Sequence, residues 1–269
     1  MIYIWACILL MPVNLSLEVR KWHILAGTAA PISYWKALTS FLAGLAFSIV
    51  TPNRLGEYPG RILYLKRKNT FRLISVAVLG VFAQLLALMI FGIIALIYYN
   101  IAFPGIWEKV VLGLTIIITI GIGVVYHKFE NWLPLINRYE WARKFNIYTQ
   151  LINRFSTKQQ LTILCISLLR FAVFTAQYLF FLRWMNVNVP ILDGYLLSAL
   201  FFWVLAVIPS IALAELGIRG QVGLFLFGHF STNTIGILGA TVGLWVLNLI
   251  IPSIIGSLLL LRMRILKIN

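Results

Sequence analysis

The sequence predicts an all-α fold: a polytopic bundle of transmembrane helices with two re-entrant or broken helices and an inverted repeat. Of its 269 residues, 61% are hydrophobic and only 11% are charged, whereas a soluble domain carries about 25% charged residues. Long apolar runs recur along the chain, and no insert between them is long enough to fold alone. Two of the runs are interrupted by segments of similar composition. We therefore expect a single integral membrane domain over residues 1–269.

The apolar runs give the order of the membrane elements. A helix needs about 20 apolar residues to cross a bilayer. By that measure we expect about six full spans, at residues 1–17, 73–99, 110–126, 160–182, 191–208 and 235–261. Residues 37–50 are too few to cross, and basic residues flank them on both sides. That run is predicted to be a re-entrant hairpin that returns through Pro52.

The two interruptions share the same residue types. The first runs from Thr51 to Arg61 and the second from Pro209 to Gly220, and each combines Pro and Gly with one Glu and at least one Arg. Broken apolar segments in corresponding positions of two halves are typical of the substrate site of a transporter. If the basic C-terminal tail lies inside, the second break must be a discontinuous helix, with residues 221–234 as its outer half. The sequence thus predicts a polar site at membrane depth, built twice.

A different pattern follows the run at 110–126. Apolar and aromatic residues recur at steps of four and three, with basic residues between them, at Trp141, Phe145, Tyr148, Ile152 and Phe155. This pattern is typical of an amphipathic helix that lies in the membrane interface. We expect such a helix at about residues 137–157, on the inner face.

The net charge of +15 is explained by lipid rather than by nucleic acid. The basic residues gather at the ends of apolar runs, around Arg54–Arg72, Lys128–Lys158 and Arg262–Lys267. Lys and Arg in such positions mark the cytoplasmic face and meet anionic headgroups. We expect a multi-pass protein of the cytoplasmic (inner) membrane with a cytoplasmic C-terminus and with membrane lipids as its partners. The sequence says nothing about oligomeric state.

The candidate binding residues lie at the breaks and inside the spans. Glu57 is three residues from Arg54 and four from Arg61, and Glu215 is four from Arg219, so helical backbone would place each set on one face. Polar residues inside spans are costly in lipid. The candidates for substrate binding are Arg54, Glu57, Arg61, Arg170, Gln177, Glu215, Arg219 and Asn248. The alternative is structural: the Glu–Arg pairs pin a loop, and Gln84 and Asn248 form interhelical hydrogen bonds.

Catalytic and metal-binding patterns are missing from the sequence. The acids and histidines do not show metal-ligand spacing, and neither a nucleophile elbow nor a phosphate-binding loop occurs. We therefore expect no metal, no cofactor, no catalytic residues and no enzyme activity. Movement of an amphiphile needs only a cavity lined by Arg and amide groups.

Several of these motifs resemble one family. They are Arg20-Lys21-Trp22, Pro52-Asn53-Arg54-Leu55-Gly56-Glu57 with Arg61, Leu168-Leu169-Arg170 with Gln177, the segment from Pro209 to Arg219, and Asn248 with Pro252 and Gly256. On these residues the chain resembles the lysylphosphatidylglycerol synthase transmembrane-domain family, a flippase-like integral membrane family. The resemblance implies a lipid-flipping or lipid-handling domain, often fused to or working beside an enzyme that modifies the headgroup.

The chain departs from that family in two places. Members usually have one more N-terminal helix, so the resemblance implies that such a helix is missing here. Members also commonly place Glu directly after the Arg of the second motif, where this chain has Gly220. We expect Glu215, one turn earlier, to take that role.

The favoured function is that of a lipid flippase or lipid-handling protein. It would bind and translocate an anionic or glycosylated amphipathic lipid by its headgroup, through a central polar cavity. One alternative is a membrane-embedded transferase acting on a lipid-linked sugar or a phospholipid headgroup, with Glu57 as its base. The other is a small-solute transporter.

Overall fold

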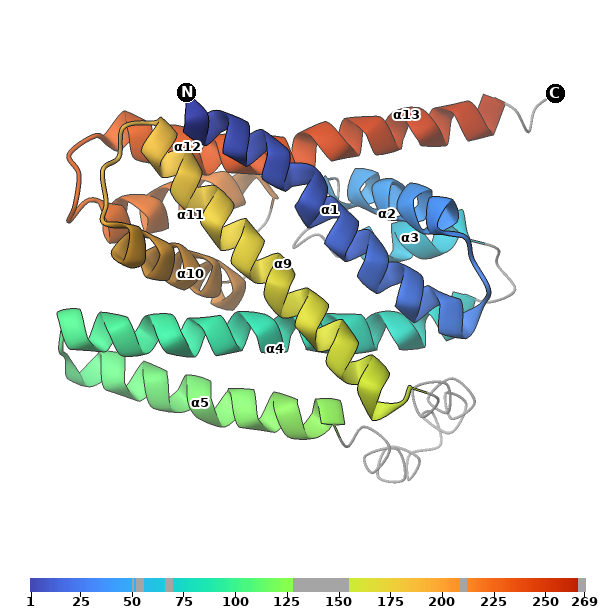
Figure 1. Ribbon diagram of the computed structural model, residues 1–269, viewed down its shortest axis with the longest axis horizontal. Coiled ribbons are helices and arrows are strands. Elements are labelled where there is room, and N and C mark those ends of the chain that lie inside the picture. Colours follow the sequence, from blue (N-terminus) through green and yellow to red (C-terminus); the bar gives the residue numbers. More distant parts are fainter. Residues whose placement is uncertain (50, 52–55, 66–69, 128–154, 209–211, 266–269) are drawn as a thin grey trace.

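The computed structural model is all-helical throughout the residues that it describes, which are 1–49, 51, 56–65, 70–127, 155–208 and 212–265. The helices are α1 (Ile2–Ala29), α2 (Tyr34–Ile49), α3 (Glu57–Tyr64), α4 (Thr70–Ala102), α5 (Ile106–His127), α9 (Thr157–Trp184), α10 (Ile191–Val207), α11 (Ala212–Phe227), α12 (Thr234–Trp245) and α13 (Ile251–Ile265). A π-helical turn, Val246–Ile250, joins α12 to α13. Figure 1 shows the long helices running side by side along the length of the molecule.

Within the described part of the chain, five helices are long and apolar enough to cross a membrane. They are Ile2–Ala29, Arg72–Ala102, Ile106–His127, Thr157–Trp184 and Thr234–Leu261. The prediction of a short first span at residues 1–17 was wrong, because α1 continues for 28 residues. The prediction of about six full spans was also too high. Helix α10 has 17 residues and at about 1.5 Å per residue is shorter than a bilayer core.

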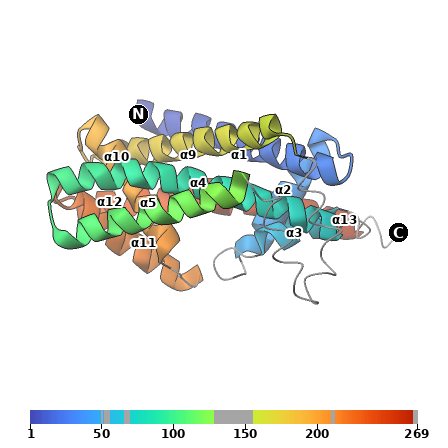
Figure 2. The same cartoon turned by 90° about the horizontal axis from the view of Figure 1, so that it is seen from below.

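The remaining helices form two hairpins that open at opposite ends of the molecule. Helices α2 and α3 pack on each other at the end where α13 finishes, and α10 and α11 pack on each other at the end where α9 finishes (Figure 1 and Figure 2). The second hairpin starts and ends at one level, since Asn233 Nδ2 donates to the Met185 carbonyl at 2.9 Å. The turns of both hairpins therefore point toward the middle of the bundle.

The second break is narrower than the sequence suggested. Helix α11 begins at Ala212 and continues to Phe227, so Glu215, Arg219 and Gly220 lie on regular helix rather than in an unwound stretch. The prediction of a separate outer half-helix at 221–234 was therefore wrong. Pro209 cannot continue a helix, but an isolated glycine costs a helix only about 1 kcal/mol, which explains why Gly217 and Gly220 do not interrupt α11.

The two hairpins belong to two units of similar composition and opposite direction. In the first unit, α1 is followed by the α2–α3 hairpin and α4; in the second, α9 is followed by the α10–α11 hairpin and the continuous α12–α13 rod. Helices α1 and α9 cross in the centre and make the most extensive helix pair (Figure 1). Helix α5 packs on α4 at the outside (Figure 2). This arrangement is the one expected of an inverted repeat.

Each unit has its own apolar core, fixed by one buried aromatic donor. In the first core Trp22 is fully buried and its indole Nε1 donates to Ser40 Oγ at 2.7 Å. In the second, Tyr178 is fully buried and its hydroxyl shares a hydrogen bond with Thr241 at 2.7 Å. These bonds satisfy the polar end of a large ring, which would otherwise be costly to bury. The predicted interfacial helix at about 137–157 lies almost entirely outside the described residues.

Close packing of the first hairpin gives a testable prediction. A Cβ at Gly44 on α2 would collide with the Glu57 carbonyl oxygen and the Arg61 side chain on α3. Gly44→Ala is therefore expected to lower the free energy of unfolding by about 1–3 kcal/mol, measured by equilibrium unfolding in mixed micelles. Gly27→Ala is the matched control, because nothing lies within 4 Å of a Cβ at Gly27. Equal stability of the two variants would show that α2 and α3 do not pack this closely.

Candidate functional site

The centre of the polar site is Glu18, a buried carboxylate on α1. Its side chain is 2% exposed and is surrounded by three cations. The oxygen Oε2 lies 2.8 Å from Lys21 Nζ and 3.2 Å from Arg170 Nη1, and Oε1 lies 3.1 Å from Arg61 Nη1. Lys21 is one turn along the same helix, whereas Arg61 and Arg170 come from α3 and α9. Glu18 therefore joins both halves of the molecule.

The first hairpin contributes an ion pair that the sequence predicted. Glu57 and Arg61, four residues apart on α3, form a salt bridge. Arg61 is 1% exposed, and its guanidinium lies 4.7–5.4 Å from the ring centres of Phe41, Tyr58 and Trp22. Burial alone would lower the pKa of Arg61, but the Glu57 and Glu18 carboxylates raise it above its ordinary value. Arg61 therefore remains a cation that ties α3 to α1.

Arg170, in the middle of α9, is the partly exposed member of this network, with 29% of its side chain accessible. Its Nε donates to Asn14 Oδ1 at 3.0 Å and its Nη1 to Gln84 Oε1 at 3.1 Å. Gln84 also accepts from Lys21 Nζ at 3.0 Å. The third nitrogen, Nη2, has no hydrogen-bond partner among the described residues. An Arg inside a membrane must be paired or face a polar space, and Arg170 does both.

The second hairpin repeats the ion pair of the first. Arg219 Nε donates to Glu215 Oε1 at 2.9 Å, four residues earlier on α11, and Nη2 contacts the same oxygen. The spacing that places Glu57 with Arg61 thus also places Glu215 with Arg219, because residues four apart share a helix face. Both sequence-based pairings are confirmed. Arg54, the third basic residue proposed beside Glu57, lies outside the described residues.

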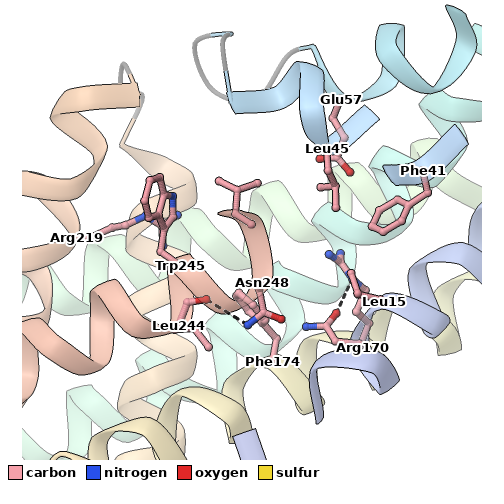
Figure 3. Close-up of a pocket in the computed structure, with 12 residues that line it drawn as sticks. Leu15, Phe41, Leu45, Glu57, Arg170, Phe174, Arg219, Leu244, Trp245 and Asn248 are labelled. Carbon is pink, nitrogen blue, oxygen red and sulfur yellow. Dashed lines mark hydrogen bonds between the residues drawn. The ribbon is translucent and has the colours of Figure 1, made fainter. Parts of the chain in front are cut away.

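A small cavity separates the two hairpins. Figure 3 shows Glu57 on one side of it, Arg219 and Trp245 on the other, and Arg170 with Asn248 between them. Its other lining residues are Asn14, Leu15, Phe41, Leu45, Phe174, Leu244 and Leu249. The cavity has a volume of about 60 Å³, which suffices for a few water molecules and not for a lipid headgroup.

The π-helical turn positions one wall of the cavity. Pro252 has no N–H with which to reach the Asn248 carbonyl four residues earlier, and the helix widens over Val246–Ile250. Single π turns inside α-helices occur frequently at functional sites. Here the turn presents Asn248, whose Nδ2 donates to Gln177 Oε1 at 2.9 Å and to the Leu244 carbonyl at 3.2 Å.

The eight predicted site residues separate into three groups. Glu57, Arg170, Arg219 and Asn248 line the cavity together. Arg61, Gln177 and Glu215 hold cavity residues from behind. Arg54 is not described. Gln84 makes interhelical hydrogen bonds, as the structural alternative predicted, and Asn248 makes one as well while also lining the cavity.

Sequence reasoning missed the most connected residue of the site. Glu18 was placed at the end of a short span, near the inner interface. Because α1 extends to Ala29, Glu18 lies well inside the helix. The signal was available: Glu18 is the single acid between Met1 and Val50, and an isolated acid in an apolar run requires a partner. The described residues include no group of three or more His, Cys, Asp or Glu able to hold a metal.

Comparison with known proteins agrees with this architecture. The family model for the lysylphosphatidylglycerol synthase TM region matches residues 1–256, and the chain belongs to that family. No curated protein and no solved structure gives a significant match.

Proposed function

We propose that this member of the family binds the headgroup of an anionic or glycosylated membrane lipid in the central cavity and moves it across the bilayer. The observation that carries the proposal is the pair of arginines, Arg170 and Arg219, at one cavity between the turns of two opposed hairpins. Burying such cations near the bilayer centre costs several kcal/mol unless an anion or water compensates them. A lipid phosphate supplies that anion.

The helix directions support the same ligand. Helices α3 and α11 both begin beside the cavity, at Glu57 and Ala212. The first turn of a helix carries a partial positive charge, and discontinuous helices of transporters point such ends at anionic groups. The hairpin turns therefore add to the attraction of the arginines for a phosphate.

The size of the cavity defines what transport requires. A space of about 60 Å³ cannot admit a headgroup, so the conformation described is occluded. Binding then requires the α2–α3 and α10–α11 hairpins to separate. We infer alternating movement of the two hairpins, each opening the cavity toward its own end of the molecule. A separate enzyme that modifies headgroups would act beside this domain.

The membrane orientation is part of the proposal. The exposed side chains of Lys36, Arg72 and Lys158 lie at the end where the α2–α3 hairpin opens, and basic residues favour the cytoplasmic side. We place this end and the C-terminus in the cytoplasm of a cell with the protein in its inner membrane. Both hairpins are then re-entrant, one from each face.

Cysteine labelling tests that orientation. In a background lacking Cys7 and Cys165, single Cys substitutions at Lys36 and Arg72 are expected to react only after the inner face is opened. Substitutions at Asn186 and Ser231, which flank the other hairpin, are expected to react from outside. Reaction of Lys36→Cys and Arg72→Cys from opposite faces would overturn the re-entrant hairpin.

Reconstitution tests the function. Purified protein in liposomes is expected to move a fluorescent phospholipid between leaflets without any donor substrate. Product formation that depends on an added donor would instead support the membrane-embedded transferase. Uptake of a water-soluble compound with no lipid movement would support the solute transporter.

A further inference from the structure

The orientation of the Asn248 amide is fixed by a chain of hydrogen bonds. Gln177 is fully buried, and its Nε2 donates to the Cys7 carbonyl at 2.8 Å. Its Oε1 must then accept, which it does from Asn248 Nδ2. Because the amide nitrogen of Asn248 is committed to Gln177 and Leu244, the amide oxygen is the atom left over.

That oxygen is a buried acceptor without a partner. Asn248 Oδ1 is inaccessible and makes no hydrogen bond among the described residues. In Figure 3 it points to the Arg170 side of the cavity. Buried acceptors are rarely left unpaired, and leaving one so costs about 1–3 kcal/mol. The Glu57 carboxylate is a second acceptor on the cavity wall.

The charges around the cavity limit what can pair with these acceptors. Among the described residues, four cations lie in or directly behind the cavity: Lys21, Arg61, Arg170 and Arg219. Three carboxylates accompany them: Glu18, Glu57 and Glu215. The surplus is one positive charge. A monoanionic phosphodiester removes that surplus, whereas a headgroup that also carries an ammonium would restore it.

We propose that Asn248 is a specificity-determining residue whose Oδ1 accepts a hydrogen bond from a headgroup hydroxyl. The phosphodiester faces Arg170 and Arg219 in this arrangement, and the hydroxyl-bearing part of the headgroup reaches Asn248. The site therefore selects hydroxyl-bearing, monoanionic phosphodiester lipids, with a glycerol or sugar beyond the phosphate. This inference rests on the proposed lipid binding and adds the substrate class.

The test compares lipids that differ only in the donor. The full chain is purified in detergent, and its affinities for phosphatidylglycerol and phosphatidylethanol with identical acyl chains are measured by native mass spectrometry. Both lipids carry one negative charge, but phosphatidylethanol has no hydroxyl. Phosphatidylglycerol is expected to bind about tenfold more tightly, since one hydrogen bond and one satisfied acceptor are at stake. Phosphatidylethanolamine, which adds an ammonium, is expected to bind more weakly than phosphatidylglycerol.

Variants assign the preference to Asn248. Asn248→Leu is expected to reduce the preference for phosphatidylglycerol to within about twofold, because the acceptor is gone, with phosphatidylethanol affinity little changed. Asn100→Leu is the matched control. Asn100 Oδ1 is also buried without a hydrogen-bond partner, but it lies near the end of α4 and does not line the cavity. This variant should keep the preference.

The outcomes separate this inference from the function on which it rests. If neither anionic lipid binds, lipid binding itself is overturned and the inference falls with it. Equal binding of the two anionic lipids by the unaltered protein overturns the hydroxyl preference alone, and so does tighter binding of phosphatidylethanolamine. This comparison does not depend on whether a variant folds. Retention of the full preference in Asn248→Leu would remove Asn248 from the site.

Discussion

Replacing Glu18 with Gln is expected to lower the free energy of unfolding by about 3–5 kcal/mol. The substitution removes the one carboxylate that contacts Lys21, Arg61 and Arg170. Lys21 and Arg61 are each only 1% exposed, so water cannot replace the lost partner. Breaking a buried ion pair from one side is costly for this reason. The measurement is equilibrium unfolding of the purified protein in mixed micelles.

Two further variants make the result specific. Glu108→Gln, an acid in the first turn of α5, is the matched control and is expected to change stability by less than about 0.5 kcal/mol. Glu18→Gln combined with Lys21→Gln is expected to recover part of the loss, because one uncompensated buried charge goes with its partner. Wild-type stability of Glu18→Gln would show that the three cations do not depend on this carboxylate.

Glu57→Gln and Arg219→Gln are each expected to reduce lipid translocation at least tenfold, although the two residues lie on different hairpins. Both line the same cavity (Figure 3), so each substitution alters the charge that a headgroup meets there. The double variant is expected to lose less than the product of the single effects. Residues that share one site couple in this way, whereas distant residues act additively.

The folding of these variants is expected to survive. In Glu57→Gln, Arg61 keeps Glu18 as a partner, so no buried cation is abandoned. Arg183→Gln provides the control, since Arg183 lies at the end of α9 and donates to the Val189 carbonyl, away from the cavity. Translocation is measured in liposomes, and folding is followed by gel filtration. Single variants that fold and move lipid at the wild-type rate would relegate the cavity charges to architecture.

Local features of the fold followed from the sequence. Apolar length and sparse charge predicted a helical membrane protein, and the described helices agree. Pro52 and Pro209 predicted where two helices stop, and spacings of four predicted the Glu57–Arg61 and Glu215–Arg219 pairs. All of these depend on neighbours within one or two turns, where helix geometry alone fixes which side chains meet.

The count of spans and the extent of the second break did not follow. The sequence shows that a run is apolar, but not whether it crosses the bundle or turns back within it. Helix α10 turns back because its partner, α11, returns to the same end, where Asn233 contacts Met185. The chain positions of that contact are 48 apart, so no local periodicity reveals it.

The sequence by itself determined that this protein is a membrane helical bundle with two charged breaks, and it identified most of the side chains around the cavity. Only the tertiary structure decided that Glu18 unites cations from three helices, that Arg61 faces inward while Arg170 faces the cavity, and which atom of Asn248 remains free. Arg61 and Glu18 are 43 positions apart, and Arg170 and Asn14 are 156 apart. Such contacts depend on how helices pack, and packing is set by the whole bundle rather than by any one segment.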